Sequence, residues 1–180
     1  MGRPRLEELP HYLYEDYVCW EGRWELINGV PYAMAPAPSR RHQSLSSRID
    51  RLLQEALEDC GRCEVLLPVD WKIADDTIVQ PDNLVICDDT DETPYISRPP
   101  RLIFEILSKG TAHKDRGLKL KLYEREGVSY YVIVDPEAGS LRVFQLQHGS
   151  YVDKGDLAQE SFDFDLGACR FTLDFSRVWS

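Results

Sequence analysis

The sequence predicts an α/β (α+β) fold in which helices flank a mixed β-sheet core and a β-hairpin comes first. Short segments rich in Val, Ile and Leu, separated by turn-forming residues, are typical of strands and occur at 63–74, 77–87 and 101–108. Two longer segments, 39–61 and 111–127, have apolar residues at helical spacing. The order of hairpin, helix, three strands, helix and further strands indicates helices layered on a sheet.

Length, apolar runs and net charge limit which classes of protein the chain can belong to. The chain has 180 residues, so we expect one domain, 1–180, with a substantial core. No run of 18 apolar residues occurs, and we therefore expect no membrane-spanning helix. The N-terminal segment "MGRPRLEELP" lacks the apolar stretch of a signal peptide, so we expect a cytoplasmic protein. The net charge of −10 argues against binding nucleic acid through a general positive field, but it leaves room for a local basic groove.

The five cysteines are odd in number and scattered, which suits a reducing cytosol better than a disulfide framework. The stretch "CGRC" at 60–63 is a lone CxxC. A zinc site needs about four ligands, and no second pair of cysteines occurs in the sequence. We therefore expect these cysteines to be structural.

The N-terminal part predicts a helix of one or two turns within 6–18 and a hairpin over 23–35. Asn28 and Gly29 lie between two apolar runs of the hairpin, and both residues accept the positive φ of a type I′ turn. Segments rich in Pro, Asp or Ser predict loops at 35–40, 88–95 and 97–100.

The two helices should end at Gly61 and Gly127, because glycine favours a helix stop. The apolar stripe of the first helix consists of Leu45, Ile49, Leu52, Leu53 and Leu57. Beyond the second helix we expect a strand within 128–139, a hairpin reaching residue 151 and an edge strand within 162–179.

Glu105 is the most informative polar residue, because it lies inside the apolar strand "RLIFEILS". Alternation puts Leu102, Phe104 and Ile106 on one face and Glu105 with Ile103 and Leu107 on the other. A carboxylate between apolar faces needs a cation, a metal or a hydrogen-bond donor nearby. The alternatives are an edge strand whose Glu reaches water, or a structural ion pair.

Asp82 is a second acid and follows Pro81 where an apolar strand begins. On its own it is typical of a turn. On a strand next to Glu105 it becomes a candidate ligand for Mg²⁺, which typically takes one or two carboxylates and keeps waters.

Lys119 is the lysine that a helical wheel places inward in 111–127. At 100° per residue it lies between Leu122 and Tyr123, whereas Lys114 and Lys121 fall on the flank. The alternative is that Lys119 extends to solvent and pairs with Asp115 at i,i+4.

Glu25 in the hairpin and His42 at the start of the first long helix are further candidates, although lone residues of these types are more often structural. A helix N-terminus flanked by arginines can hold a phosphate. The cations that could form a basic rim are Arg40, Arg41, Arg48, Lys109, Lys114 and Arg116.

Several of these segments together resemble a known family. "VQPDNLVI", "RLIFEILS" and "KDRGLKLKLYEREGVSYYVIVDP" resemble the PD-(D/E)XK nuclease superfamily, and more closely its Uma-two family, described as "putative restriction endonuclease". "WELINGVPYAMAPAPSRRHQSLSSRI" matches the same family, so the resemblance runs from about residue 12 to residue 150. It implies a restriction-endonuclease-like core.

The resemblance also implies roles for individual residues. Asp82 matches the first acid and Glu105 the second, but Leu107 stands where the superfamily usually keeps its lysine. Lys119 matches a lysine that has migrated to the following helix. The other matches are Glu25 with the N-terminal acid, His42 with a recurrent histidine, and Asp115 and Tyr123 with the helix motif.

The resemblance therefore implies a Mg²⁺-dependent endonuclease, with Mn²⁺ as a substitute metal, acting on nucleic acid and most often DNA. Asp82, Glu105 and the backbone carbonyl of Ile106 would hold the metal. Lys119 and Glu25 would complete the catalytic set, and His42, Arg41 and Tyr123 would bind substrate. A homodimer is also implied. Two alternatives stay open: a degenerate nuclease fold that binds protein or nucleic acid without cutting, and a metal-dependent enzyme acting on a small phosphate ester.

Overall fold

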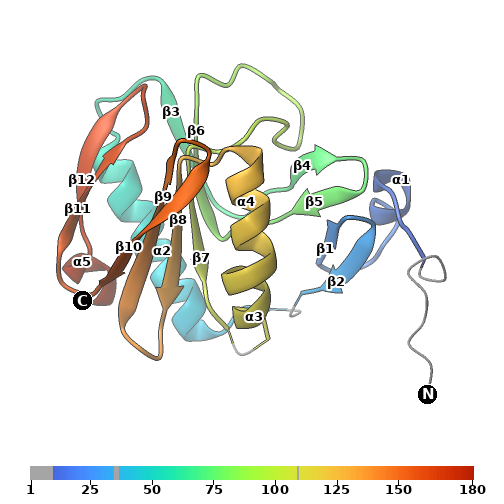
Figure 1. Ribbon diagram of the computed structural model, residues 1–180, viewed down its shortest axis with the longest axis horizontal. Helices are drawn as coiled ribbons and strands as arrows, with labels where there is room; N and C mark the ends of the chain where they lie inside the picture. Colours follow the sequence, from blue (N-terminus) through green and yellow to red (C-terminus); the bar gives the residue numbers. More distant parts are fainter. Residues whose placement is uncertain (1–9, 35–36, 109) are drawn as a thin grey trace.

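A six-stranded mixed sheet forms the centre of the protein (Figure 1). The structure is a computed structural model and describes residues 10–34, 37–108 and 110–180. The strand order is β10-β9-β8-β7-β6-β3, and only β7 and β8 pair in parallel. The predicted mixed sheet is therefore confirmed. Its strands are β3 (Cys63–Leu66), β6 (Asn83–Cys87), β7 (Leu102–Ile106), β8 (Tyr130–Asp135), β9 (Ser140–Gln147) and β10 (Ser150–Leu157).

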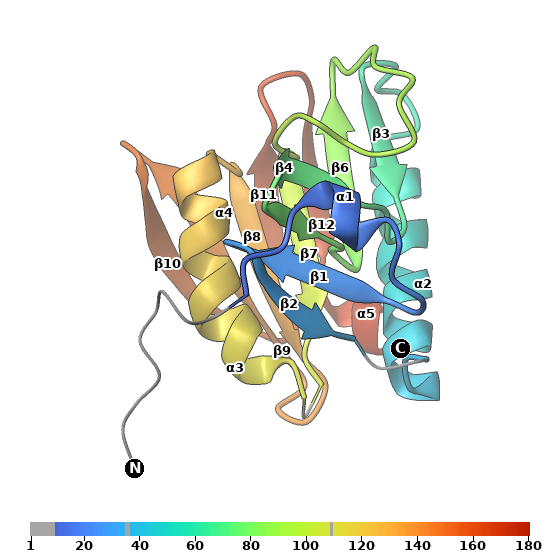
Figure 2. The same ribbon diagram turned by 90° about the vertical axis from the view of Figure 1, so that its right-hand side faces the viewer.

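Helical segments cover the two faces of this sheet, and Figure 2 shows the sheet between them. One face packs against the 17-residue helix α2 (Arg40–Ala56), whose apolar stripe Leu45, Ile49, Leu52 and Leu53 is buried as predicted. The other face packs against a continuous helical segment made of α3 (Ala112–Lys114), η2 (Asp115–Lys119) and α4 (Leu120–Glu126). This segment ends at Gly127, whose φ of 82° confirms the predicted stop.

A second, four-stranded sheet lies beside that helical segment, in the order β2-β1-β5-β4. The predicted hairpin forms β1 (Trp24–Ile27) and β2 (Val30–Ala33), with φ of 51° at Asn28 and 74° at Gly29, as a type I′ turn requires. The remaining elements here are β4 (Trp71–Ala74), β5 (Thr77–Val79) and the short helix α1 (Tyr14–Tyr17).

The segments 63–74 and 77–87, each expected to be one strand, are each divided between the two sheets. Residues 63–66 and 83–87 join the central sheet, whereas 71–74 and 77–79 join the smaller one. Pro68 and Pro81 lie at the two divisions, where a missing N–H cannot continue a ladder. The prediction of two continuous strands was therefore wrong.

Two other boundaries differ from prediction. Helix α2 ends at Ala56, five residues before Gly61. Residues 162–179 form no edge strand of the central sheet. They contribute to a separate hairpin of β11 (Ser161–Asp165) and β12 (Arg170–Asp174), followed by α5 (Ser176–Trp179). Phe164, Leu173 and Phe175 bury this hairpin against the α2 side of the core, so packing replaces edge pairing.

The cysteines are less scattered in space than in sequence. Cys60 and Cys169 form one disulfide and Cys63 and Cys87 another, while the exposed Cys19 is free. The sequence predicted structural cysteines without a disulfide framework, whereas the pairing of β3 with β6 and the packing of the β11–β12 turn bring four of them together in two pairs.

None of the helices that the structure describes combines the length and the apolar character needed to cross a membrane.

Candidate active site

Glu105 lies in β7 on the face of the central sheet that α4 covers. Leu102, Phe104 and Ile106 pack toward α2, while Ile103 packs into the opposite cluster, so the predicted alternation is confirmed. Only 4% of Glu105 is exposed. Because β7 pairs with β6 on one side and β8 on the other, the alternative of an edge strand is excluded.

Asp82 directly precedes β6, as the sequence predicted. The register Asn83↔Phe104, extended by one residue, sets Asp82 opposite Glu105. The Asp82 carboxylate is held on two sides: its Oδ2 accepts a hydrogen bond of 2.8 Å from the Ile106 N–H and lies 3.2 Å from Nε2 of His42. The two acids therefore face the same space from adjacent strands.

Lys119 extends into this space from the last position of η2. Its Nζ lies 2.7 Å from Oε1 of Glu105 and 2.7 Å from Oε1 of Glu25, but 3.7 Å from Oδ1 of Asp115. Only 2% of Lys119 is exposed. The simple i,i+4 pair with Asp115 is therefore the longest of three contacts, and the shorter two join the helix to both sheets.

Lys114 also reaches the site, which contradicts its predicted position on the flank. Its Nζ donates to Oε2 of Glu25, while Lys119 donates to Oε1 of the same carboxylate. The helical wheel assumed α-helical geometry throughout, but η2 is a π-helical turn, whose i→i+5 backbone hydrogen bonds change the angular positions of the side chains. Gly117 in the middle of the predicted helix was the one local sign of irregularity.

Glu25 and Tyr123 are fully buried and hold other site residues in place. Besides the two lysines, Glu25 accepts a hydrogen bond of 2.9 Å from the backbone N–H of Gln80, a partner that sequence reasoning missed. The Tyr123 hydroxyl donates to Oε1 of Glu105 at 2.8 Å. Both residues therefore position the charged groups from behind rather than lining the open space in front of them. The substrate-binding role that the resemblance implied for Tyr123 does not fit this buried position.

Burial and charge shift the pKa values of this cluster in different directions. Burial raises the pKa of Glu105 well above its usual range against the opposing Lys119 ammonium, and burial likewise raises the pKa of Asp115. For Glu25 burial acts upward too, but Lys119 and Lys114 outweigh it and lower the pKa. Burial would lower the pKa of Lys119, yet the surrounding carboxylates hold it well above its usual value.

His42 is tied electrostatically to Asp82. Burial acts to lower the pKa of His42, but the hydrogen bond to Asp82 and its negative charge raise it overall, and the backbone of Ile106 acts in the same direction. The imidazole is therefore poised to hold a proton beside the Asp82 carboxylate.

The donor set fits a hard divalent cation. Four carboxylates, those of Glu25, Asp82, Glu105 and Asp115, face two ammonium groups and the His42 imidazole among the described residues. This surplus of acids accompanies the raised pKa of two of them, Glu105 and Asp115. Oδ1 of Asp115 is buried and has no hydrogen-bond partner among the described residues. A divalent cation could neutralise these carboxylates in place of protons. Two carboxylates would suffice for Mg²⁺, because waters usually complete its coordination.

The charged groups open onto a cavity of about 710 Å³. Asp82, Glu105, Lys119 and Ile106 line its floor, and His42 and Arg41 line the wall that α2 forms. Lys114 and Arg116 belong to it as well, and Arg116 donates to Asp135 at 2.6 Å.

A shallower hollow of about 300 Å³ adjoins this wall and shares Arg41 with the cavity. Arg40, Arg48 and Trp179 complete its basic and aromatic lining. Of the predicted basic rim, therefore, five members lie at these two hollows, and Lys109 lies outside the described residues.

A model of the Uma2 family, whose description is "putative restriction endonuclease", matches residues 14–163. The chain belongs to the Uma2 family. The match includes Glu25, Asp82, Glu105 and Lys119, and it confirms the resemblance that the sequence motifs indicated.

Two known proteins are similar to this Uma2 chain. The uncharacterized protein slr1290 of Synechocystis is 36% identical in a match of 118 residues that covers 61% of this chain. The chain spans about 60% of that relative's length. The crystal structure of a putative nuclease belonging to DUF820 from Anabaena variabilis matches with a TM-score of 0.75 at 14% identity, over 93% of this chain and 97% of that one. At this identity the likeness shows the fold, and the predicted nuclease-like architecture is confirmed.

Proposed function

We propose that this Uma2 protein is a Mg²⁺-dependent endonuclease that hydrolyses phosphodiester bonds in nucleic acid, with DNA as its substrate. One observation carries the proposal: Asp82, Glu105 and Lys119, which come from three separate elements, line one cavity. Their types and positions fit the two acids and the lysine of the nuclease resemblance. We further propose that residues 1–180 act as one domain, in a homodimer in the cytoplasm.

The proposed metal ligands are Asp82, Glu105 and the backbone carbonyl of Ile106. Mg²⁺, or Mn²⁺ in its place, would supply Lewis acidity and a water of lowered pKa. His42 and the Ile106 N–H fix the Asp82 carboxylate, and Tyr123 fixes that of Glu105. The ligands are thus oriented in advance by hydrogen bonds from behind, as tight metal geometry requires.

Lys119 would stabilise negative charge on the phosphate that is being cleaved, or orient the attacking water. Its ammonium stays protonated because carboxylates surround it, and Glu25 sets its position. Glu25 lies behind Lys119 and does not line the cavity, so its catalytic role would act through the lysine.

The basic surface favours a polymeric substrate over a small phosphate ester. Arg40 and Arg41 are exposed at the start of α2, and the hollow that they line extends from the cavity toward Arg48. Cations along such a path can contact successive phosphates, which a small ester would not need. Arg41 and His42 at the cavity wall would contact the phosphate next to the cut.

The decisive experiment is cleavage of single-stranded and double-stranded DNA and RNA in Mg²⁺, compared with chelator. We expect metal-dependent cleavage by the parent and at least a 100-fold loss in Asp82→Asn, which keeps an oxygen to accept the Ile106 N–H. The matched control is Glu92→Gln, an acid in an exposed loop. If Asp82→Asn cuts at the parent rate, the assignment is wrong.

The alternative of a degenerate, non-cutting fold predicts a different result. Calorimetric titration with Mn²⁺ would then show no site in the parent, and no substrate would be cut. A Mn²⁺ site that disappears in Glu105→Ala supports the metal assignment independently of finding the right substrate.

A further inference from the structure

Four cysteines meet at one place that is remote from the cavity. Cys60 follows α2 and Cys63 begins β3, while Cys87 ends β6 and Cys169 lies in the β11–β12 turn. The cavity involves the opposite, N-terminal end of α2, which is roughly 25 Å away by the rise of a 17-residue helix. The proposed nuclease activity uses none of these cysteines.

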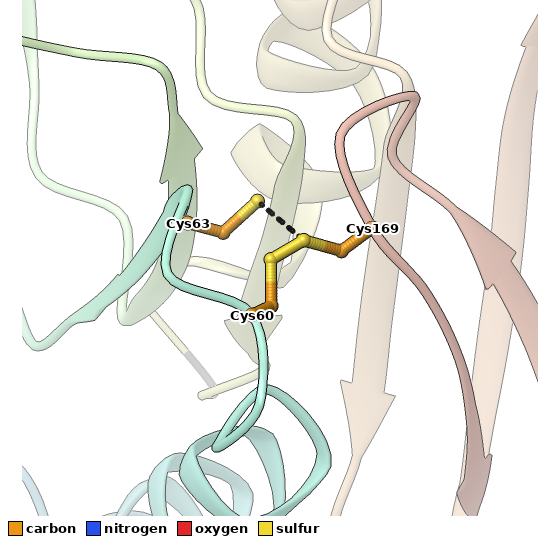
Figure 3. Close-up of side chains that lie close together, drawn as sticks. All are labelled: Cys60, Cys63 and Cys169. Atoms are coloured by element: carbon orange, nitrogen blue, oxygen red, sulfur yellow. Dashed lines mark hydrogen bonds between the residues drawn. A yellow bond between two sulfur atoms is a disulfide. The ribbon is translucent and has the colours of Figure 1, made fainter.

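Three of the four sulfur atoms share one small volume, and the fourth, that of Cys87, is bonded to one of them. Cys63 and Cys87 are partners across β3 and β6, and their Sγ atoms are bonded. Cys60 and Cys169 are likewise bonded, with Cα atoms 6.2 Å apart. The two pairs also touch, because Sγ of Cys63 lies 3.7 Å from Sγ of Cys169, as Figure 3 shows. The Sγ atoms of Cys60, Cys63 and Cys169 all lie within 4.8 Å of one another.

This spacing is that of a tetrahedral thiolate site. With Zn–S bonds of about 2.3 Å, tetrahedral geometry sets neighbouring sulfurs about 3.8 Å apart. The contact of 3.7 Å between Cys63 and Cys169 is close to this length, although no covalent bond joins the two sulfurs. Two independent disulfides do not require the sulfur of Cys63 to lie this close to the Cys60–Cys169 pair. The two-residue gap between Cys60 and Cys63 is also a common spacing of zinc ligands.

We propose that Cys60, Cys63, Cys87 and Cys169, as free thiols, bind one Zn²⁺ ion in a tetrathiolate site. Each thiol loses its proton on binding, so the site releases up to four protons and involves no change of redox state. The two disulfides are the competing state, and forming them from the thiols would need an oxidant that accepts four electrons.

The site would attach the C-terminal hairpin to the central sheet. Cys169 belongs to β11–β12, whose strands pair only with each other among the described elements, whereas Cys63 and Cys87 belong to paired strands of that sheet. Cys169 also lies beyond residues 14–163, the part that matches the Uma2 family. The fourth ligand is therefore a feature of this chain that the family match does not cover.

The first test is the metal content of the full chain, purified from a reducing cytosol with a phosphine reductant and without chelator. We expect about one zinc per chain by plasma mass spectrometry, with the four cysteines reduced by intact mass. Replacement by Co²⁺ should add thiolate charge-transfer absorption. A zinc-free chain would overturn the proposal, whether its cysteines are reduced or paired, and so would iron with the visible absorption of an iron–sulfur cluster.

Variants locate the ligands. Cys87→Ser and Cys169→Ser should each lose most of the zinc, while Cys19→Ser, at an exposed cysteine outside the cluster, should keep it. Asp82→Asn should also keep it, which separates this ion from one in the cavity. Zinc that persists at the parent level in both cluster variants contradicts the assignment.

A measurement on the parent chain covers the case in which the cluster variants do not fold. Titration with an organomercurial reagent and a zinc indicator should release the zinc in step with modification of the cluster thiols. Release with only Cys19 modified, or retention after all thiols are modified, would overturn the site.

Discussion

The two faces of the central sheet differ sharply, although they are built from the same strands. Toward α2, β7 presents Leu102, Phe104 and Ile106 to a continuous apolar core. Toward η2 and α4, the alternate position in the same strand is Glu105, which is held by Lys119 and Tyr123. The first face is stabilised by burial of apolar area, and the second contains buried charges that are costly unless they are paired.

This difference assigns separate roles to the two faces: the α2 face stabilises the fold, and the face toward η2 and α4 contains the candidate site. Truncating a side chain of the well-packed apolar face lowers the stability of the fold, but this face has no groups that could take part in a reaction. The charged face keeps a surplus of carboxylates, which burial alone disfavours, and this arrangement is typical of functional sites. Substitutions on the two faces should therefore have separable consequences.

The largest expected effect is that of Lys119→Met, because it removes the cation shared by Glu25 and Glu105. Removing one partner of a buried ion pair typically costs about 3–5 kcal/mol in the free energy of unfolding. Glu25 would keep Lys114, and Glu105 would keep only the Tyr123 hydroxyl among the described side chains. Cleavage should be lost as well. Urea denaturation measures the first and the DNA assay the second. The control is Lys121→Met, at an exposed position of α4. A stable Lys119→Met protein would show that the network does not depend on this lysine.

Phe104→Ala should separate stability from function. The side chain is fully buried under α2, and such truncations cost about 3–5 kcal/mol through lost burial and the remaining cavity. Below its lowered melting temperature, the folded protein should cut DNA at close to the parent rate and bind Mn²⁺ normally. Loss of metal binding in a folded Phe104→Ala protein would mean that the two faces are coupled.

Glu105→Gln, one residue along the same strand, should have the opposite effect: stability is kept, whereas metal binding and cleavage are lost. Because burial raises the pKa of Glu105, an amide of the same shape replaces a group whose charge is disfavoured, and we expect a change in unfolding free energy within about 1 kcal/mol. Metal binding and cleavage should fall at least 100-fold. Melting curves and Mn²⁺ calorimetry on one preparation test this. Wild-type metal affinity in this variant would remove Glu105 from the ligand set.

Much of the site could be predicted because it depends on local periodicity. The alternation of β7 placed Glu105 opposite the α2 face, and Pro81 marked where Asp82 begins a strand. The helical wheel correctly selected Lys119 as inward-facing. Lys114 could not be predicted in this way, because the π turn depends on how the helical segment docks on both sheets.

The division of 63–87 between two sheets escaped prediction for a similar reason. Hydrophobic runs show that strands form, but they do not show which partners the strands take. Pro68 and Pro81 lie at the two breaks, and only the paired structure reveals that the chain changes sheets there.

The sequence by itself determined the features that nearby residues control. These are the Asn28–Gly29 turn, the two faces of β7, the apolar stripe of α2 and the end of the helix at Gly127. The steric limits of the backbone and the periods of helix and strand act within a few residues, so a local reading can recover them. The tertiary structure alone decided that Glu25 would join Lys114 and Lys119, and that the cysteines at 60, 63, 87 and 169 would meet. Those contacts join residues up to 109 positions apart and depend on strand pairing and core packing across the whole chain.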